Sequence, residues 1–208
     1  MDARVTLIAS NGVMLECAGK KLLLDALHNG KSVGFSNPPA DVLENILNAG
    51  LPFDNISCLL FTHVHPDHFH APLVAQYILA HPEQTVLVPK DCADMLPEMV
   101  SRGNISTIHD FNGGNISLDI SGIKVTTYES SHIKGINNSY SDIKNYCLLI
   151  IIAGKKFLFP GDADFNVDFC KNIADEHDID VLFTNPLYLN RPRGRRIIKA
   201  MEAKHNVI

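Results

Sequence analysis

Short apolar runs separated by turn-forming dipeptides open the chain. Three such runs lie at residues 4–9, 12–18 and 20–25. Asn11-Gly12 and Gly19-Lys20 lie between them, and dipeptides of this kind favour tight turns that join antiparallel strands. The pattern therefore predicts three strands joined by hairpins at the start of the chain.

Helix-like and strand-like patterns alternate through the rest of the sequence. After Pro38-Pro39 apolar residues recur at helical spacing as far as Gly50, which predicts a helix of about 11 residues. Residues 56–61 form a continuous apolar run, typical of a strand covered on both faces. Further helices are predicted near residues 73–78, 166–177 and 195–203, and further strands at 85–88, within 105–129, and at 146–152, 156–159 and 181–183.

This order of elements predicts a layered α/β fold. Sheets built partly from hairpins bury one face each, and helices must cover the other. We predict a four-layer αββα sandwich of two mixed β-sheets with helices on the outer faces. Residues 1–208 contain no fixed-period repeat and no flexible linker, so a single domain is expected, with its final strand incomplete at the end of the sequence.

Composition narrows the function classes. With 46% hydrophobic and 20% charged residues the chain is too apolar for disorder, and its apolar runs are too short for a membrane span. A net charge of −5 does not favour polyanions, so nucleic acid is not expected as a partner. The start lacks a secretory signal, and the 5 cysteines form no C-x-x-C pair. We expect a cytoplasmic protein with reduced cysteines, a small-molecule substrate and no membrane partner.

A histidine-rich stretch, THVHPDH at residues 62–68, follows the apolar run that ends at residue 61. His63 and His65, two residues apart on an extended segment, can point to one side and bind one ion, whereas Asp67 and His68 can face a second. Imidazole and carboxylate suit zinc, manganese or iron, and the absence of nearby cysteine disfavours a structural thiolate site. The alternative is a solvated loop, but H-x-H-x-D-H arises by chance in only about two chains per thousand of this composition.

With this motif the sequence resembles the metallo-β-lactamase-fold superfamily, whose signature continues with a distant His, a distant Asp and a final His. His132 ends a predicted strand and matches the third imidazole; Asp162, after Pro160-Gly161, matches the bridging carboxylate, with Asp164 as its competitor. Asp25 matches an aspartate that supports the site through hydrogen bonds, although a plain turn residue has the same appearance. The resemblance implies six ligands for two divalent ions: His63, His65 and His132 for the first, and Asp67, His68 and Asp162 for the second.

The end of the sequence departs from the family pattern. The family's last histidine follows a final strand, whereas residues 205–208 only begin one. Three explanations stay open: the chain stops short of the position of this last histidine, the second metal has fewer protein ligands, or His205 substitutes for the missing histidine. His205 is disfavoured because it stands at the start of the strand.

The resemblance implies a metal-dependent hydrolase, most simply with two zinc ions, although manganese or iron would fit the same ligands. Asp67 would also orient the attacking water. Arginines cluster around Gly194 at a predicted helix start, and Arg191 and Arg193 are candidates for binding an anionic ester, lactone or phosphodiester, unless they are simply solvated. The alternatives are a tRNA-processing-type nuclease or phosphodiesterase, and a non-catalytic metal-binding member of the fold.

Overall fold

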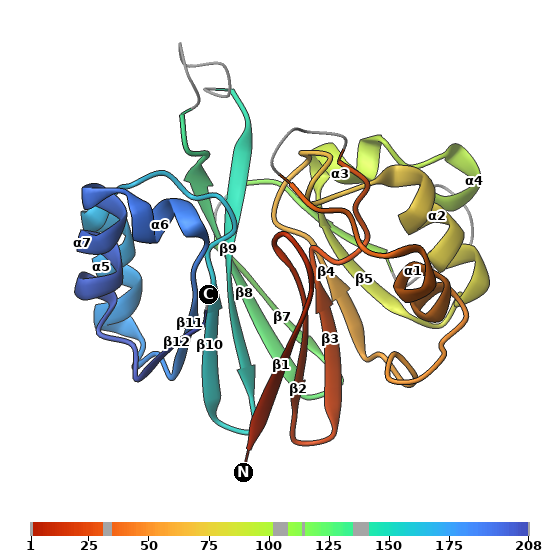
Figure 1. Ribbon diagram of the computed structural model, residues 1–208, viewed down its shortest axis with the longest axis horizontal. Helices are drawn as coiled ribbons and strands as arrows, with labels where there is room; N and C mark the ends of the chain where they lie inside the picture. The colour runs from red at the N-terminus through yellow and green to blue at the C-terminus, as the bar shows by residue number, and fades with distance from the viewer. Residues whose placement is uncertain (1, 31–34, 102–107, 114, 135–141, 208) are drawn as a thin grey trace. The chain divides into compact units, whose positions relative to one another are not determined.

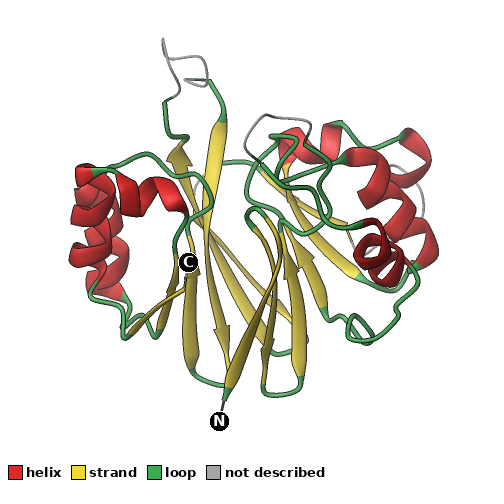
Figure 2. Cartoon of the chain, viewed as in Figure 1, coloured by secondary structure: helices red, strands yellow, loops and turns green. Residues whose placement is uncertain are grey.

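The computed structural model describes residues 2–30, 35–101, 108–113, 115–134 and 142–207. The chain divides into two compact units, residues 1–112 and 113–208. Each unit contains one six-stranded sheet, and helices pack against that sheet (Figures 1 and 2).

The first unit contains a mixed sheet with strands in sequence order. Two antiparallel hairpins link β1 to β3, and the later strands add in parallel. The strands are β1 (Ala3–Ala9), β2 (Gly12–Cys17), β3 (Lys20–Leu24), β4 (Cys58–Leu60), β5 (Thr85–Pro89) and β6 (Ile108–Phe111). The helices are α1 (Ala40–Leu47), α2 (Ala71–Ala80), α3 (Lys90–Asp94) and α4 (Glu98–Ser101).

The hydrophobic core of this unit joins the sheet to the helices. Leu23 and Leu59 contribute from the strands, and Ile46 and Val74 from α1 and α2; all four are at most 1% exposed. Burying side chains of this size stabilises the fold by about 1.5–3 kcal/mol each. This core fixes the carboxyl ends of β3 and β4; Asp25 follows β3, and the histidine-rich loop follows β4.

The second unit contains a mixed sheet in the order β12-β11-β10-β9-β8-β7. Its strands are β7 (Asn115–Ile120), β8 (Ile123–Ser131), β9 (Lys144–Ile152), β10 (Lys155–Phe159), β11 (Val181–Phe183) and β12 (His205–Val207). Pairing is antiparallel from β7 to β10, and parallel from β10 to β12. Helices α5 (Val167–Glu176), α6 (Pro186–Asn190) and α7 (Pro192–Met201) follow the later strands.

The predicted α/β class, with two mixed sheets and helices, is confirmed. The first two turns differ by one residue from the prediction: Ser10 and Ala18 adopt positive φ, and Gly12 already belongs to β2. A side chain on Gly12 would place its Cβ 2.9 Å from the carbonyl oxygen of Asp25, so the glycine permits a close approach. The sequence pattern predicts no helix at residues 186–190, where the structure has α6. Among the described residues no helix has the length and apolar character needed to cross a membrane.

Candidate metal centre

The histidine-rich loop leaves the sheet where β4 ends. Strand β4 pairs in parallel with β3 and β5, and α/β proteins place ligand sites at this carboxyl edge. His63 and His68 are fully buried and Asp67 is 7% exposed, whereas His65 is half-buried. The backbone N–H groups of His68 and Phe69 both donate to the carbonyl of His65, at 2.9 and 2.8 Å, which folds the loop into a tight turn.

Asp25 supports this loop from the end of β3. Its carboxylate accepts the Thr62 backbone N–H at 2.9 Å, the Thr62 hydroxyl at 2.6 Å and the Nδ1–H of His68 at 2.8 Å. The residue is fully buried and has a φ of 46°, a conformation that is uncommon for side chains other than Asn and Asp. The structure thus brings Asp25 and His68 together; a role toward a metal stays a prediction.

A short segment after Asp25 braces the other side of the loop. The Asn29 N–H donates to the Pro66 carbonyl at 3.2 Å, and the His70 N–H donates to the Leu27 carbonyl at 3.0 Å. A Cβ on Gly30 would lie 2.9 Å from the backbone nitrogen of Asp67. Only glycine therefore lets this segment lie directly against Asp67, a function that no local sequence signal revealed.

His28 lies in the same segment and is fully buried. Its Nε2–H donates to the carbonyl of Ala9 at 3.2 Å. Burial has the largest effect on the pKa of His28 and lowers it, whereas the hydrogen bond to Ala9 raises it by less. His28 therefore stays neutral and structural, outside the histidine-rich motif.

The hydrogen bonds of Thr62 fix the tautomer of His63. The Thr62 hydroxyl has one proton, which it donates to Asp25, so toward Nδ1 of His63, 3.0 Å away, its oxygen acts as an acceptor. Nδ1 of His63 then carries the proton, and the lone pair lies on Nε2, 3.0 Å from Nδ1 of His65. A tetrahedral zinc with Zn–N bonds of about 2.0–2.1 Å separates two ligand nitrogens by about 3.3 Å, so this pair fits a shared cation.

His68 is engaged on both ring nitrogens. The Asp25 carboxylate can only accept a hydrogen bond, so Nδ1 of His68 carries the proton and Nε2 carries the lone pair. The amide nitrogen of Asn11 lies 2.8 Å from Nε2. The Asp67 carboxylate lies 3.7 Å from the same Nε2. Asn11 was predicted only as a turn residue; in the structure it contacts the lone pair that a metal on His68 would need.

In the second unit, His132 and Asp162 lie on two adjoining loops. His132 pairs with Ala163 in an isolated bridge, and the Ile133 N–H donates to the Asp162 carbonyl at 2.8 Å. Nδ1 of His132 donates to the Ile133 carbonyl at 2.7 Å, which leaves the lone pair on Nε2. That atom lies 3.5 Å from a carboxylate oxygen of Asp162, so two electron-pair donors converge as the residues of a cation site do.

Two buried asparagines hold Asp162 in place. The side chain of Asn145 accepts the Asp162 N–H at 2.9 Å and donates to the Pro160 carbonyl at 2.8 Å. Asn185 donates to the Asp162 carboxylate at 2.9 Å, while its oxygen caps the first turn of α6. Sequence reasoning missed both. The Asn-Pro pair at residues 185–186 is a helix-start signal; Asn145 has no such signal.

The competing candidates have other partners. The Asp164 carboxylate accepts the backbone N–H of Phe165 at 2.8 Å, so it closes its own turn. His205 is exposed at the start of β12, level with Val181 and with Phe157 in the middle of β10, whereas Asp162 lies beyond the carboxyl end of β10. The geometry within each unit thus favours Asp162 over Asp164 and disfavours His205.

The predicted anion-binding residues lie at the start of α7. Arg191 is its N-cap and Arg193 is in its first turn, and both are exposed. Helix α6 separates them from Asn185 and hence from Asp162.

The family model of the beta-lactamase superfamily domain matches residues 4–204 of this chain. The chain belongs to the β-lactamase superfamily. This confirms the metallo-β-lactamase-fold resemblance, whose signature residues are the ones placed above. No curated protein matches the chain significantly in sequence.

Solved structures show the same superfamily fold. A possible metal-dependent hydrolase from Veillonella parvula is 16% identical with a TM-score of 0.68, over 98% of this chain and 84% of the other. The isothiocyanate hydrolase from Delia radicum gut bacteria is 16% identical with a TM-score of 0.62, over 98% and 83%. The short form of human tRNase Z is 14% identical with a TM-score of 0.59, over 99% and 93%. At these identities the likeness shows the fold alone.

Proposed function

We propose that this β-lactamase superfamily protein is a metal-dependent hydrolase that attacks its substrate with water activated by two divalent ions, with zinc as the expected metal. The proposed ligands are His63, His65 and His132 for the first ion, and Asp67, His68 and Asp162 for the second. The observation that carries the proposal is the pair His63 and His65, whose ring nitrogens lie 3.0 Å apart with the His63 lone pair directed at the gap. The convergence of His132 and Asp162 in the other unit supports it.

Bound ions of this kind lower the pKa of a bound water to about 7 and polarise the bond that it attacks. The residues of the chain supply orientation and proton handling. Thr62 and Asp25 keep the protons on the Nδ1 atoms of His63 and His68, so both Nε2 atoms can act as electron-pair donors. Asp67, held against Gly30, would accept a hydrogen bond from the attacking water and so orient it. The proposed substrate is a small anionic ester, lactone or phosphodiester.

One observation favours a second candidate, a metal-binding member of the fold without turnover. The Asn11 amide already contacts the Nε2 of His68, so an ion at His68 requires Asn11 to move. A nuclease, our other alternative, is disfavoured by the net charge of −5. The fold likeness to human tRNase Z does not change this.

Elemental analysis of protein purified without chelator tests the proposal. We expect about two ions per chain, and a loss of metal in His63→Ala and in Asp162→Ala. Asp164→Asn is the matched control, because it removes a neighbouring carboxylate that bonds its own turn. Metal retained in both ligand variants, or lost equally in the control, would refute the ligand assignment. Metal without hydrolysis of esters, lactones or phosphodiesters would favour the non-catalytic candidate.

A further inference from the structure

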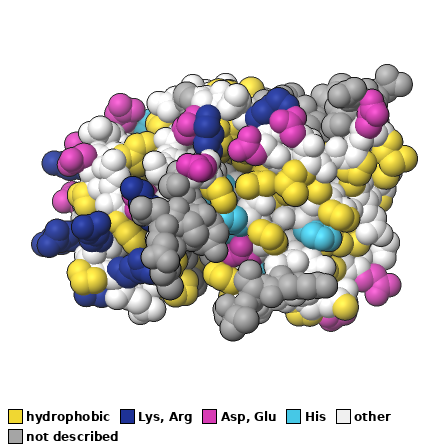
Figure 3. All heavy atoms as spheres, turned by 90° about the horizontal axis from the view of Figure 1, so that it is seen from above, with side chains coloured by type: hydrophobic (Ala, Val, Ile, Leu, Met, Phe, Trp, Pro, Cys, Tyr) yellow, Lys and Arg dark blue, Asp and Glu magenta, His cyan; other side chains and the backbone are white. Residues whose placement is uncertain are grey.

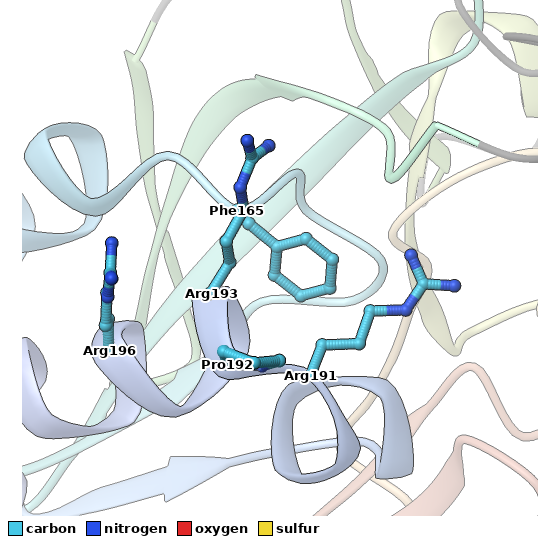
Figure 4. Close-up of a pocket in the computed structure, with 5 residues that line it drawn as sticks. All are labelled: Phe165, Arg191, Pro192, Arg193 and Arg196. Carbon is cyan, nitrogen blue, oxygen red and sulfur yellow. The ribbon is translucent and has the colours of Figure 1, made fainter.

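Helix α7 begins beside an open pocket of about 640 Å³ within the second unit. Its lining residues are Phe165, Arg191, Pro192, Arg193 and Arg196. Figure 4 shows the Phe165 ring between the side chains of Arg191 and Arg193. Basic side chains also gather on the side of the molecule where α5 to α7 lie (Figure 3). All three charged residues of the lining thus have the same sign.

The placement of these arginines is electrostatically unfavourable without a partner. The N-terminus of a helix carries a partial positive charge, and cations there are destabilising. Arg191 caps α7 without a side-chain hydrogen bond to the first turn, Arg193 lies in that turn, and Arg196 lies at the start of the next. Within the part of the chain that the structure describes, none of the three forms an ion pair with an acidic group. An oxyanion in the pocket would offset both the charge repulsion and the exposed helix end.

The pocket is built on tightly packed backbone. A Cβ on Gly194 would lie 2.4 Å from Cα of Tyr188, so only glycine lets α7 lie this close to α6. The Tyr188 hydroxyl donates to the Ala163 carbonyl at 2.8 Å, and its ring packs edge-on against Phe165 at 5.4 Å. Arg191 in turn lies over the Phe165 ring, 5.8 Å from its centre. These contacts join the arginines to the loop that carries Asp162.

Helix α6 sets the separation between the pocket and Asp162. Asn185, at the start of α6, contacts the Asp162 carboxylate, and Arg191 follows the helix directly. Six residues at a rise of about 1.5 Å per residue span about 9 Å. The backbone of Arg191 therefore lies about 9 Å along the helix axis from that of Asn185.

We infer that this arginine pocket binds an oxyanion group of the substrate, a phosphate or a carboxylate, at a point on the substrate away from the bond that is cleaved. The part that concerns cleavage rests on the proposed hydrolase function. The binding itself does not, because all of its residues lie outside the proposed ligand set. Arginine suits both anions because its planar fork can donate two parallel hydrogen bonds.

Binding is measured by calorimetric titration of the metal-free 208-residue chain with phenyl phosphate, benzoate and neutral benzyl alcohol. We expect the anions to bind and benzyl alcohol not to bind, and the tighter anion identifies the group. Arg193→Gln should weaken anion binding about tenfold. Arg195→Gln is the matched control: it lies on the same helix, is equally exposed, and donates to the Leu189 carbonyl instead of lining the pocket. Its Kd should stay within about twofold.

Absence of anion binding, equal effects of the two variants, or equal binding of benzyl alcohol would overturn the inference. With the metal-loaded enzyme, Arg193→Gln should raise KM for anionic substrates and leave kcat unchanged. Anion binding without hydrolysis of any substrate would refute the proposed function and leave the anion-binding pocket standing. Hydrolysis with the same KM in Arg193→Gln and Arg195→Gln would refute the role of the pocket in substrate binding and leave the proposed hydrolase function standing.

Discussion

Replacing Asp25 with asparagine tests whether this residue prepares the metal centre or merely stabilises a turn. The substitution keeps the size of the side chain, and asparagine tolerates the φ of 46° at this position. Its effects are therefore confined to the hydrogen bonds of the carboxylate. The amide oxygen can still accept the Thr62 N–H, but the amide NH₂ cannot accept from the Thr62 hydroxyl or from Nδ1–H of His68.

The expected loss of stability follows from these contacts. Hydrogen bonds to a charged group contribute about 1.5–3 kcal/mol each, and two of the three are lost. Removing the cost of burying a carboxylate offsets part of that loss. We expect the free energy of unfolding of the metal-free chain to fall by about 1–3 kcal/mol, measured by urea denaturation.

The effect on metal affinity separates the two roles. An NH₂ group facing His68 favours the tautomer with its proton on Nε2, which removes the lone pair needed for a metal. Losing such a supporting hydrogen bond lowers metal affinity about 10–100-fold, measured by competition with a chromophoric chelator. Asp54→Asn is the control. The Asp54 carboxylate accepts a hydrogen bond from the Lys21 ammonium group at a distance of 2.7 Å, and this pair does not involve the histidine-rich loop. Reduced stability with unchanged metal affinity in Asp25→Asn would refute our reasoning and leave Asp25 as a structural residue.

Three further predictions concern single residues. Asn11→Ala should tighten binding of the second ion about tenfold, because it removes the amide that contacts Nε2 of His68. Competition with a chromophoric chelator measures this affinity. Weaker binding in the variant would contradict the prediction and show that Asn11 supports the metal. Gly194→Ala should lower the free energy of unfolding by about 1–3 kcal/mol in urea denaturation, since its Cβ would lie 2.4 Å from Tyr188 backbone atoms. A loss under about 1 kcal/mol would contradict the packing described. Burial lowers the pKa of His28 in the folded chain below the value of about 6.5 expected in the unfolded chain. Between these two pKa values the unfolded chain binds a proton at His28 and the folded chain does not. The free energy of unfolding should therefore fall as the pH drops from about 6.5 toward the folded pKa. His28→Gln should remove up to about 1.4 kcal/mol per pH unit of that slope, and an unchanged slope in denaturation at several pH values would show that His28 does not titrate as expected.

Local patterns account for what the sequence predicted well. The hairpins at the start were predictable because turn residues and alternating apolar runs act over a few positions, and the histidine-rich motif was predictable because its residues are contiguous. The turns nevertheless begin one residue earlier, since Ser10 and Ala18 already take positive φ and Gly12 and Lys20 already belong to strands. The layered α/β arrangement followed from the order of the elements, whereas the order of the strands within each sheet was not visible from periodicity.

The supporting residues could not be predicted because they depend on contacts between distant segments. Asn145 reaches Asp162 across 17 positions, and Asn11 reaches His68 across 57. Gly30 matters only because Asp67 lies against it. Helix α6 was missed because five residues are too few for a visible period, although Asn185 and Pro186 mark its start. The assignment of the six ligands to two ions stays a prediction.

Anomalous X-ray diffraction from crystals of the zinc-loaded protein, recorded on both sides of the zinc edge, tests the central claim most directly. We predict two anomalous peaks, one bounded by His63, His65 and His132 and the other by Asp67, His68 and Asp162. Peaks at other residues, or none in crystals grown with excess zinc, would contradict the proposed metal centre.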